Sequence, residues 1–274
     1  MDPEIGKSVD AKGIKTNYLE EGAGAPVVLI HGSGPGVTAY ANWRLVLPKL
    51  APKYRVVAPD IVGFGYTERP RDATYTLDYW IDHLLGFLDG VGIEKASFVG
   101  NSFGGALVLA LAARHPDRVD RFVLMGAAGT RFTLTSALDT VWGYEPSEAR
   151  TAEMLNYFVY DRSILTPELA ASRYKASIRP GYQESYAALF PAPRQRHIER
   201  LSTPDDLVRQ IPHRALIIHG RDDQVIPLET SLRLHSLIER SQMHVFGQCG
   251  HWVQVEKNAS FCTLVGAFLA GDMD

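Results

Sequence analysis

The stretch Val99-Gly100-Asn101-Ser102-Phe103-Gly104-Gly105 decides the fold that we expect for this chain. An apolar run at residues 97–99 is typical of a buried strand, and residues 103–114 have the pattern of a helix. Glycines two positions before and two after Ser102 leave room for a sharp turn between them. Such a turn lifts the serine hydroxyl out of the sheet and places the Phe103 amide at a helix start, where unpaired N–H groups favour negative charge. The stretch predicts a serine nucleophile; the alternative is a glycine-rich turn with an incidental serine.

Short apolar runs alternate with helical patterns on both sides of this turn. The strand candidates are residues 27–30, 54–58, 97–99, 121–125, 215–218 and 243–246. The helix candidates are residues 42–50, 77–88, 103–114, 230–238 and 259–269. Most strand candidates are nearly continuous Val, Ile and Leu, as in strands buried on both faces. The alternation predicts an α/β fold with a mostly parallel sheet and helices on both faces, which binds ligands beyond the carboxyl ends of its strands.

One long stretch interrupts the alternation. Residues 131–206 contain no convincing buried strand and are rich in Tyr, Arg and helix formers, with proline at the joints. We interpret them as a helical cap inserted into a core formed by residues 1–130 and 207–274. The alternative is a second independent domain, which would be marginally stable at that length.

Two later strand ends supply an acid and a base. A serine hydroxyl needs a base to attack a carbonyl carbon at neutral pH, and a histidine held by a carboxylate is the usual solution. The strand candidates at 215–218 and 243–246 lead into His219-Gly220-Arg221-Asp222-Asp223 and Gly247-Gln248-Cys249-Gly250-His251-Trp252, respectively. The order Ser102, Asp223, His251, with each residue at a strand end, predicts a catalytic triad.

Other acidic and basic residues near these strand ends have different expected roles. Asp222 is the alternative acid, but a turn-capping role is common for Asp in such a loop, and we favour Asp223. His31 and His219 also end strands, and we expect both to hydrogen-bond the backbone of loops.

A glycine-rich loop follows the first buried strand candidate. Residues 27–30 run into His31-Gly32-Ser33-Gly34-Pro35-Gly36. Its place in the chain predicts that the Ser33 amide joins the Phe103 amide as an oxyanion hole, because small residues let the backbone approach a reacting oxygen. The alternative, a phosphate-binding loop, is disfavoured because both glycine signatures of such loops are missing.

Composition excludes several classes of function. The 274 residues carry 28 Lys and Arg against 31 Asp and Glu, a net charge of −3 that argues against nucleic acid as a partner. Two cysteines, Cys249 and Cys262, are too few for a disulfide framework or a zinc cluster, and no histidine pair has the spacing of a zinc-binding helix. We therefore expect no metal and no cofactor. The N-terminus lacks the pattern of a signal peptide and no apolar run is long enough to span a membrane, so we expect a cytoplasmic protein.

Together these residues resemble the α/β-hydrolase superfamily and, more narrowly, the meta-cleavage product hydrolases, which cleave carbon–carbon bonds in aromatic catabolism. The motifs that carry the resemblance are His31-Gly-Ser-Gly-Pro-Gly36, Ala41-Asn-Trp-Arg44, Asp60-Ile-Val-Gly-Phe-Gly65, Gly100-Asn-Ser-Phe-Gly-Gly105, Gly126-Ala-Ala-Gly129, Gly220-Arg-Asp-Asp223 and Gly250-His-Trp252. They cover nearly the whole chain. The cap is similar to the branch of the family that contains the 2-hydroxymuconate-semialdehyde hydrolases and the cumene-pathway enzyme.

The resemblance implies an eight-stranded sheet and a substrate class. That class is a 2-hydroxy-6-oxo-hexa-2,4-dienoate with H or a small alkyl group at C6, cleaved between C5 and C6 to 2-hydroxypenta-2,4-dienoate and a small carboxylic acid. It also implies that Asn42, Asn101, Arg173 and Trp252 bind the substrate, and that the chain forms a dimer or a larger homo-oligomer. An arginine suits this role because its planar fork matches a carboxylate.

Other aspects of the reaction stay open. Candidates for the apolar pocket around C6 are Leu138, Val141, Trp142, Ile198 and Val225. Such a pocket discriminates small alkyl groups weakly, so the C6 substituent is not determined. A triad supports either an acyl-enzyme or activation of water. The alternative activity is that of a carboxylesterase or lactonase with the same triad, and a third alternative is a binding protein without turnover.

Overall fold

The computed structural model describes residues 2–273 and contains one eight-stranded sheet in the order β1-β2-β4-β3-β5-β6-β7-β8. The strands are β1 (Lys7–Ala11), β2 (Ile14–Glu21), β3 (Pro26–Ile30), β4 (Arg55–Pro59), β5 (Ala96–Asn101), β6 (Val119–Met125), β7 (Ala215–Gly220) and β8 (Ser241–Phe246). β1 pairs antiparallel with β2, and β2 with β4. All later pairings are parallel, which confirms the mostly parallel α/β fold.

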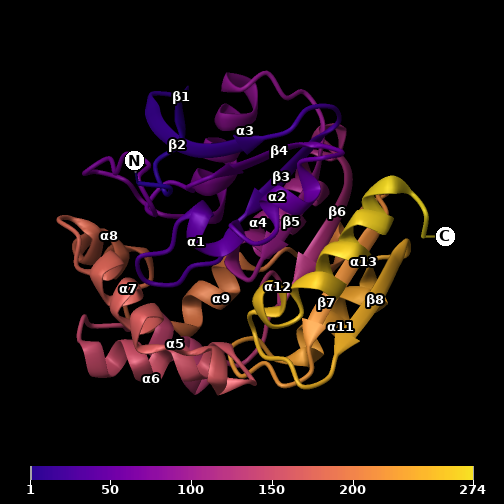
Figure 1. Cartoon of the computed structure of the whole chain (residues 1–274). Coiled ribbons are helices and arrows are strands. Elements are labelled where there is room, and N and C mark those ends of the chain that lie inside the picture. The colour runs from indigo at the N-terminus through magenta and orange to yellow at the C-terminus, as the bar shows by residue number, and fades with distance from the viewer. Residues whose placement is uncertain (1, 274) are drawn as a thin grey trace.

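Helices cover both faces of the sheet (Figure 1). The α-helices are α1 (Ala39–Trp43), α2 (Leu47–Leu50), α3 (Leu77–Gly90), α4 (Phe103–Arg114), α5 (Ser136–Trp142), α6 (Glu148–Phe158), α7 (Pro167–Ser177), α8 (Tyr182–Leu189), α9 (Gln195–Leu201), α10 (Asp205–Arg209), α11 (Leu228–Leu237), α12 (Val253–Glu256) and α13 (Asn258–Ala270). Short 3-10 helices span Pro116–Arg118 and Arg162–Ile164. None of the helices within residues 2–273 has the length and apolar character needed to cross a membrane.

Each buried strand contributes to two hydrophobic clusters. In β3, Val28 and Ile30 belong to the cluster that includes α3, α4 and α11, whereas Val27 and Leu29 belong to the cluster with α1, α2 and α13. Successive side chains of a strand point to opposite faces, so a strand with a helical layer on both sides is apolar throughout. This packing holds the strands in place and brings the loops after β3, β5, β6, β7 and β8 to one edge.

Two parts of the fold differ from the sequence prediction. β1 and β2 were not predicted, because β1 is mostly exposed and has no apolar run. The helix expected at residues 42–50 is two short helices, α1 and α2. Thr38 caps α1 earlier than expected, and Pro48 stands in the first turn of α2, where a proline is compatible only with a new helix start.

The segment between β6 and β7 is helical. Among the described residues it contains α5 to α10 and a 3-10 helix but no strand. Figure 1 shows α5 to α8 grouped together beyond the loops that follow the strands. α10 spans the predicted end of the cap at residue 206. The division into a core and a cap of residues 131–206 stays a prediction.

Candidate active site

Ser102 occupies a strained turn between β5 and α4. Its φ is 55° and its ψ is −114°, which is unusual for a residue other than glycine. The Ser102 amide donates to the Met125 carbonyl at 2.9 Å, and the Ser102 carbonyl accepts from the Ala128 amide at 3.0 Å. These contacts hold the turn against the end of β6. They lock a strained conformation of the kind that accumulates at functional sites.

Glycine is required on both sides of Ser102 because backbone carbonyl groups lie too close for a Cβ atom. A Cβ at Gly100 would lie 2.6 Å from the Gly104 carbonyl oxygen, and a Cβ at Gly104 would collide with the carbonyl oxygen of Ile30. The spacing seen in the sequence therefore has a steric cause, because α4 starts directly against β3 and β5.

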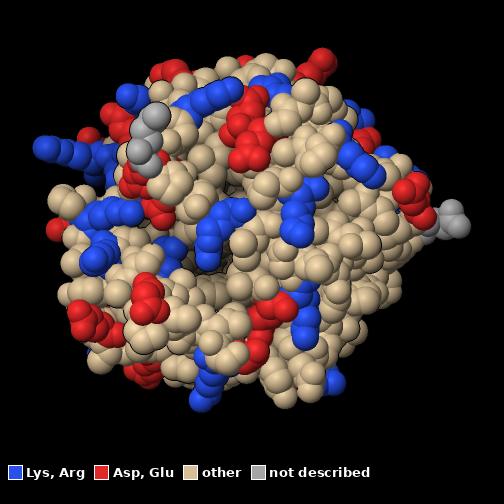
Figure 2. Space-filling view, in the orientation of Figure 1, with Lys and Arg blue, Asp and Glu red and all other residues tan. Residues whose placement is uncertain are grey.

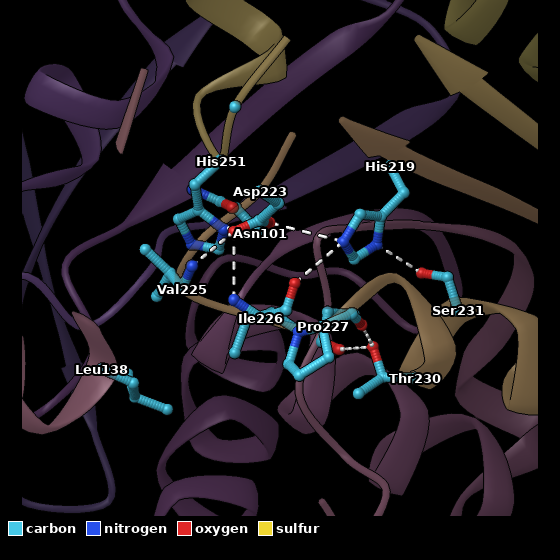
Figure 3. Close-up of polar contacts among 12 residues, drawn as sticks. Asn101, Leu138, His219, Asp223, Val225, Ile226, Pro227, Thr230, Ser231 and His251 are labelled. Carbon is cyan, nitrogen blue, oxygen red and sulfur yellow. Dashed lines mark hydrogen bonds and ion pairs between the residues drawn. The ribbon is translucent and has the colours of Figure 1, made fainter. Parts of the chain in front are cut away.

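Asp223 and His251 form a buried pair. His251 Nδ1 lies 2.7 Å from Asp223 Oδ2, and the two side chains are 4% and 1% exposed (Figure 3). Asp223 Oδ1 accepts from the amides of Val225 at 2.8 Å and Ile226 at 3.0 Å. A carboxylate only accepts, so the neutral imidazole carries its proton on Nδ1 and leaves Nε2 free to take a proton.

Asp222 has a different environment. Its carboxylate accepts from the Cys249 amide at 3.3 Å and lies 3.5 Å from the Arg221 guanidinium. It therefore bridges the loop after β7 to the loop after β8, and the position next to His251 belongs to Asp223.

Ser102 and His251 line the same cavity. The cavity measures about 160 Å³ and also reaches Ser33, Asn42 and Asn101. Within residues 2–273 no hydrogen bond joins Ser102 Oγ to His251. Such bonds often form only when a substrate is in place, so the shared cavity is the relevant geometry.

Two backbone amides at or next to the cavity wall, those of Ser33 and Phe103, have no hydrogen-bond acceptor among residues 2–273. Phe103 is the first residue of α4, so its amide has no acceptor within the helix. The Ser33 amide likewise donates to no acceptor within residues 2–273. Helices α5 and α8 hold the Ser33 loop, since Trp142 Nε1 donates to Ser33 Oγ at 3.0 Å and the Tyr186 hydroxyl donates to the Ser33 carbonyl at 2.9 Å.

His31 and His219 bond the loop backbone, as the sequence predicts. His31 Nε2 accepts from the Ile61 amide at 3.0 Å and its Nδ1 lies 2.6 Å from the Gly32 carbonyl oxygen. Burial lowers the pKa of His31 to about 4. His219 Nε2 lies 3.0 Å from the Ile226 carbonyl oxygen.

The predicted substrate-binding residues Asn42, Asn101, Arg173 and Trp252 all line the cavity. Asn42 Oδ1 accepts from Asn101 Nδ2 at 2.9 Å. Asn42 Nδ2 and Asn101 Oδ1 are buried without a partner, so one donor and one acceptor remain available. Because buried polar groups are rarely left unpaired, these two atoms indicate a polar ligand.

Arg173 reaches the cavity from α7. Its Nη2 donates to the Gly36 carbonyl at 2.6 Å, and desolvation lowers the pKa of this guanidinium. Arginine remains charged at any physiological pH, so the cavity wall carries a positive charge at this half-buried residue. Figure 2 shows a hollow between α1 and α7 with Lys or Arg side chains at its edge, whereas acidic and basic groups are interspersed elsewhere on this face.

Two polar residues of the cavity wall were missed by the sequence prediction. Arg44 and Gln254 both line the cavity, and Gln254 Oε1 is buried without a partner. Arg44 belongs to the motif Ala41-Asn-Trp-Arg44, which could have indicated a place in the cavity wall. Gln254 lies in the four-residue helix α12, which is too short for a periodic pattern.

The apolar part of the wall corrects two further expectations. Leu138, Val141 and Val225 line the cavity, together with Leu155 and other apolar residues. Trp142 and Ile198 are buried but are not part of the wall. The Trp142 ring instead stacks on Phe190, with centroids 4.3 Å apart. No group of side chains within residues 2–273 has the composition of a metal site.

Comparisons with known proteins agree with this geometry. A model of the alpha/beta hydrolase fold family matches residues 25–258. A 2-hydroxymuconate semialdehyde hydrolase of Pseudomonas sp. (strain CF600) is 59% identical over 98% of this chain and 95% of its own length. A 2-hydroxy-6-oxo-2,4-heptadienoate hydrolase of Pseudomonas putida is 58% identical over 99% of both chains. The solved structure of the meta-cleavage product hydrolase CumD from Pseudomonas fluorescens IP01 has a TM-score of 0.97 and 56% identity over 98% of this chain and 99% of its own. The chain belongs to the alpha/beta hydrolase fold family and, within it, to the meta-cleavage product hydrolases.

Proposed function

We propose that this enzyme hydrolyses the C5–C6 bond of 2-hydroxy-6-oxo-hexa-2,4-dienoates that carry H or a small alkyl group at C6. Ser102, Asp223 and His251 form its triad. The observation that carries the proposal is a single cavity that holds Ser102 and the Asp223-bound His251, with a half-buried arginine and the unpaired side-chain amide atoms of two asparagines in the same wall. The names of the close relatives point to the same substrate class.

The polar wall suits one end of such a dienoate. Arg173 binds the C1 carboxylate through its planar fork. Asn42 Nδ2 donates to an oxygen of the substrate, and Asn101 Oδ1 accepts from the 2-hydroxyl group. Trp252, whose ring stacks on Phe158 with centroids 4.9 Å apart, forms a flat apolar side for the diene. Leu138, Val141 and Val225 surround the C6 substituent.

In the proposed reaction, His251 is the group that takes up and returns protons. The 2-hydroxyl loses a proton and C5 gains one, giving a 2-oxo intermediate with a C3–C4 double bond. Ser102 Oγ, or water activated by His251, adds to C6, and the Ser33 and Phe103 amides stabilise the oxyanion. The C5–C6 bond breaks, its electron pair passes into the dienolate, and His251 returns a proton. In the serine route the C6 acyl group stays on Ser102 as an ester, and water activated by His251 breaks that ester bond and restores the serine hydroxyl. Either route therefore consumes one water and releases 2-hydroxypenta-2,4-dienoate and a small acid.

The test is the decay of the visible absorbance of 2-hydroxymuconic semialdehyde and its 6-methyl homologue. We expect the wild type to bleach both and Ser102→Ala to lose the activity, with the exposed Ser8→Ala as the matched control. Wild-type turnover by Ser102→Ala would overturn the assignment of the nucleophile. Failure to bleach either compound, together with fast hydrolysis of p-nitrophenyl acetate, would favour a carboxylesterase or lactonase.

Three organisational expectations belong with this proposal. We infer that residues 131–206 act as a cap that closes the cavity, supported by the bonds of Trp142 and Tyr186 to Ser33. A cytoplasmic location and assembly into a homo-oligomer stay predictions.

A further inference from the structure

A second histidine contacts the carboxylate of Asp223. His219 ends β7, and its ring lies on the opposite side of Asp223 from His251 (Figure 3). His219 Nε2 is 3.4 Å from Asp223 Oδ2, the same oxygen that His251 Nδ1 approaches to 2.7 Å. The side chain of His219 is 0% exposed, so water does not compete for these contacts.

The surroundings of His219 determine which nitrogen carries its proton. Nε2 faces the Ile226 carbonyl oxygen at 3.0 Å and Asp223 Oδ2, and both groups only accept. Nε2 must therefore be the donor. Burial lowers the pKa of His219, which favours the neutral ring. Nδ1 is then unprotonated and accepts from the buried Ser231 hydroxyl, whose oxygen lies 2.7 Å away.

These contacts form a directed chain. The Ser231 hydroxyl donates to His219 Nδ1, and His219 Nε2–H donates to the Ile226 carbonyl and lies 3.4 Å from Asp223 Oδ2. That carboxylate oxygen accepts from His251 Nδ1. Asp223 Oδ1 is meanwhile held by two backbone amides. The carboxylate is thus held by two amides at Oδ1 and by His251 at Oδ2, and the His219 Nε2–H dipole lies 3.4 Å from the same Oδ2.

We propose that His219 is a positioning residue of the active site, which orients Asp223 and shares its charge with His251. This inference rests on the proposed function, because His251 is taken as the base. His219 is not a catalytic residue, since it lies outside the wall of the cavity. Its effect reaches the substrate only through Asp223 and His251.

The expected pH effect follows from the charges around the ring. The titratable groups that act on His219 are Asp223 and His251 in the adjacent loops and Glu229 in α11. Without the Nε2–H dipole, more of the Asp223 charge faces His251 and holds the imidazolium form. The neutral base then becomes available only at higher pH, so the acidic limb of the pH profile moves upward.

The first experiment compares His219→Leu with the matched control His83→Leu. His83 is also a buried histidine, bonded to the Thr16 hydroxyl at 2.9 Å, but it does not contact Asp223. We expect His219→Leu to lower kcat by about tenfold or more through misplacement of the base, with KM nearly unchanged and the acidic limb of kcat/KM at higher pH. His83→Leu should lower thermal stability and leave both the limb and kcat in place.

Two further variants keep the test decisive if His219→Leu fails to fold. His219→Gln retains an N–H donor near the position of Nε2 and should recover most of kcat and the wild-type pH limb. Ser231→Ala removes only the hydroxyl donor and should shift the limb in the same direction by less. The inference would be overturned if folded His219→Leu and Ser231→Ala both keep the wild-type kcat and the wild-type acidic limb of the pH profile. If Ser102→Ala is inactive in the same assays, the proposed function still stands.

The second experiment does not depend on any substrate. In the protein labelled with ¹⁵N-histidine, the imidazole shifts distinguish the two neutral tautomers and the charged ring, and His219→Gln assigns the resonance. We expect a protonated Nε2 and an unprotonated Nδ1 for His219 at neutral pH. An Nδ1–H tautomer or an imidazolium would overturn the inference even if the wild type cleaves dienoates, and the expected tautomer would support the chain of bonds even if it does not.

Discussion

Gly126 immediately follows β6 and lies against the Asp223–His251 pair. A Cβ at this position would lie 3.1 Å from His251 Nδ1 and 3.2 Å from Asp223 Oδ2, and the residue has a φ of +49°. We predict that Gly126→Ala lowers kcat on dienoates by about tenfold or more, because the pair must move away from the new methyl group. Steady-state kinetics on purified variants measures this effect.

Gly92 provides the matched control for Gly126. Its φ is +69°, but nothing lies within 4 Å of a Cβ built there. Both substitutions carry a backbone strain of about 1–2 kcal/mol, so both lower the melting temperature, and only Gly126→Ala should lose activity. Equal activity of the two variants would mean that the close approach at Gly126 has no role in catalysis.

At the scale of elements, the short helix α12 joins the His251 loop to the segment after α6. Glu256 ends this helix, and its Oε2 accepts from the Gly250 amide at 2.7 Å. Its Oε1 accepts from the amides of Tyr160 and Asp161, both at 2.9 Å, just after α6. One carboxylate thus links the residue before His251 to the segment after α6.

We predict that Glu256→Ala lowers both stability and kcat. Three amides lose a charged acceptor, which corresponds to about 2 kcal/mol or more of the free energy of unfolding. The His251 loop also loses its link to the segment after α6. Urea unfolding and dienoate kinetics measure the two effects, with the exposed Glu239→Ala as the control. A variant with full activity at reduced stability would show that the tie serves folding alone.

Local sequence patterns were sufficient to predict some strands of the sheet but not others. The buried parallel strands were predictable because both of their faces are covered, which makes them continuously apolar. The β1–β2 hairpin was not, because its pairing partner β4 lies in a distant part of the chain and its own residues form neither an apolar run nor a strict alternation of apolar and polar residues.

At the scale of the whole molecule, buried titratable groups make stability depend on pH. Burial lowers the pKa values of His31 and His83 to about 4 from an unfolded value of 6.5. The unfolded chain therefore binds protons that the native state excludes, and the stability that the two neutral rings contribute is complete above about pH 6.5 and lost towards pH 4. Each ring corresponds to about 3 kcal/mol.

Asp60 opposes this trend. Burial raises the pKa of its carboxyl from 3.8 to about 6, so its contribution to stability is greatest below pH 3.8 and is lost as the pH rises through 6. Because the two histidines together change the free energy of unfolding more than the one carboxyl does, we predict that the urea midpoint falls as the pH is lowered from 6.5 to 4. His83→Gln should flatten this fall, whereas substitution of the exposed His235 by Gln should not. A midpoint independent of pH would contradict the neutral state of the buried rings.

The sequence by itself determined the α/β fold, the strand–turn–helix around Ser102, and the order of a serine, an acidic residue and a histidine at successive strand ends. These features depend on neighbouring residues, because hydrophobic period and turn chemistry act over a few positions. Only the tertiary structure decided that Asp223 rather than Asp222 meets His251, that Arg44 and Gln254 join the cavity wall while Trp142 and Ile198 lie behind it, and that His219 faces the same carboxylate. Those contacts join side chains from separate strands and helices, and their distances depend on how the layers pack, which no local pattern encodes.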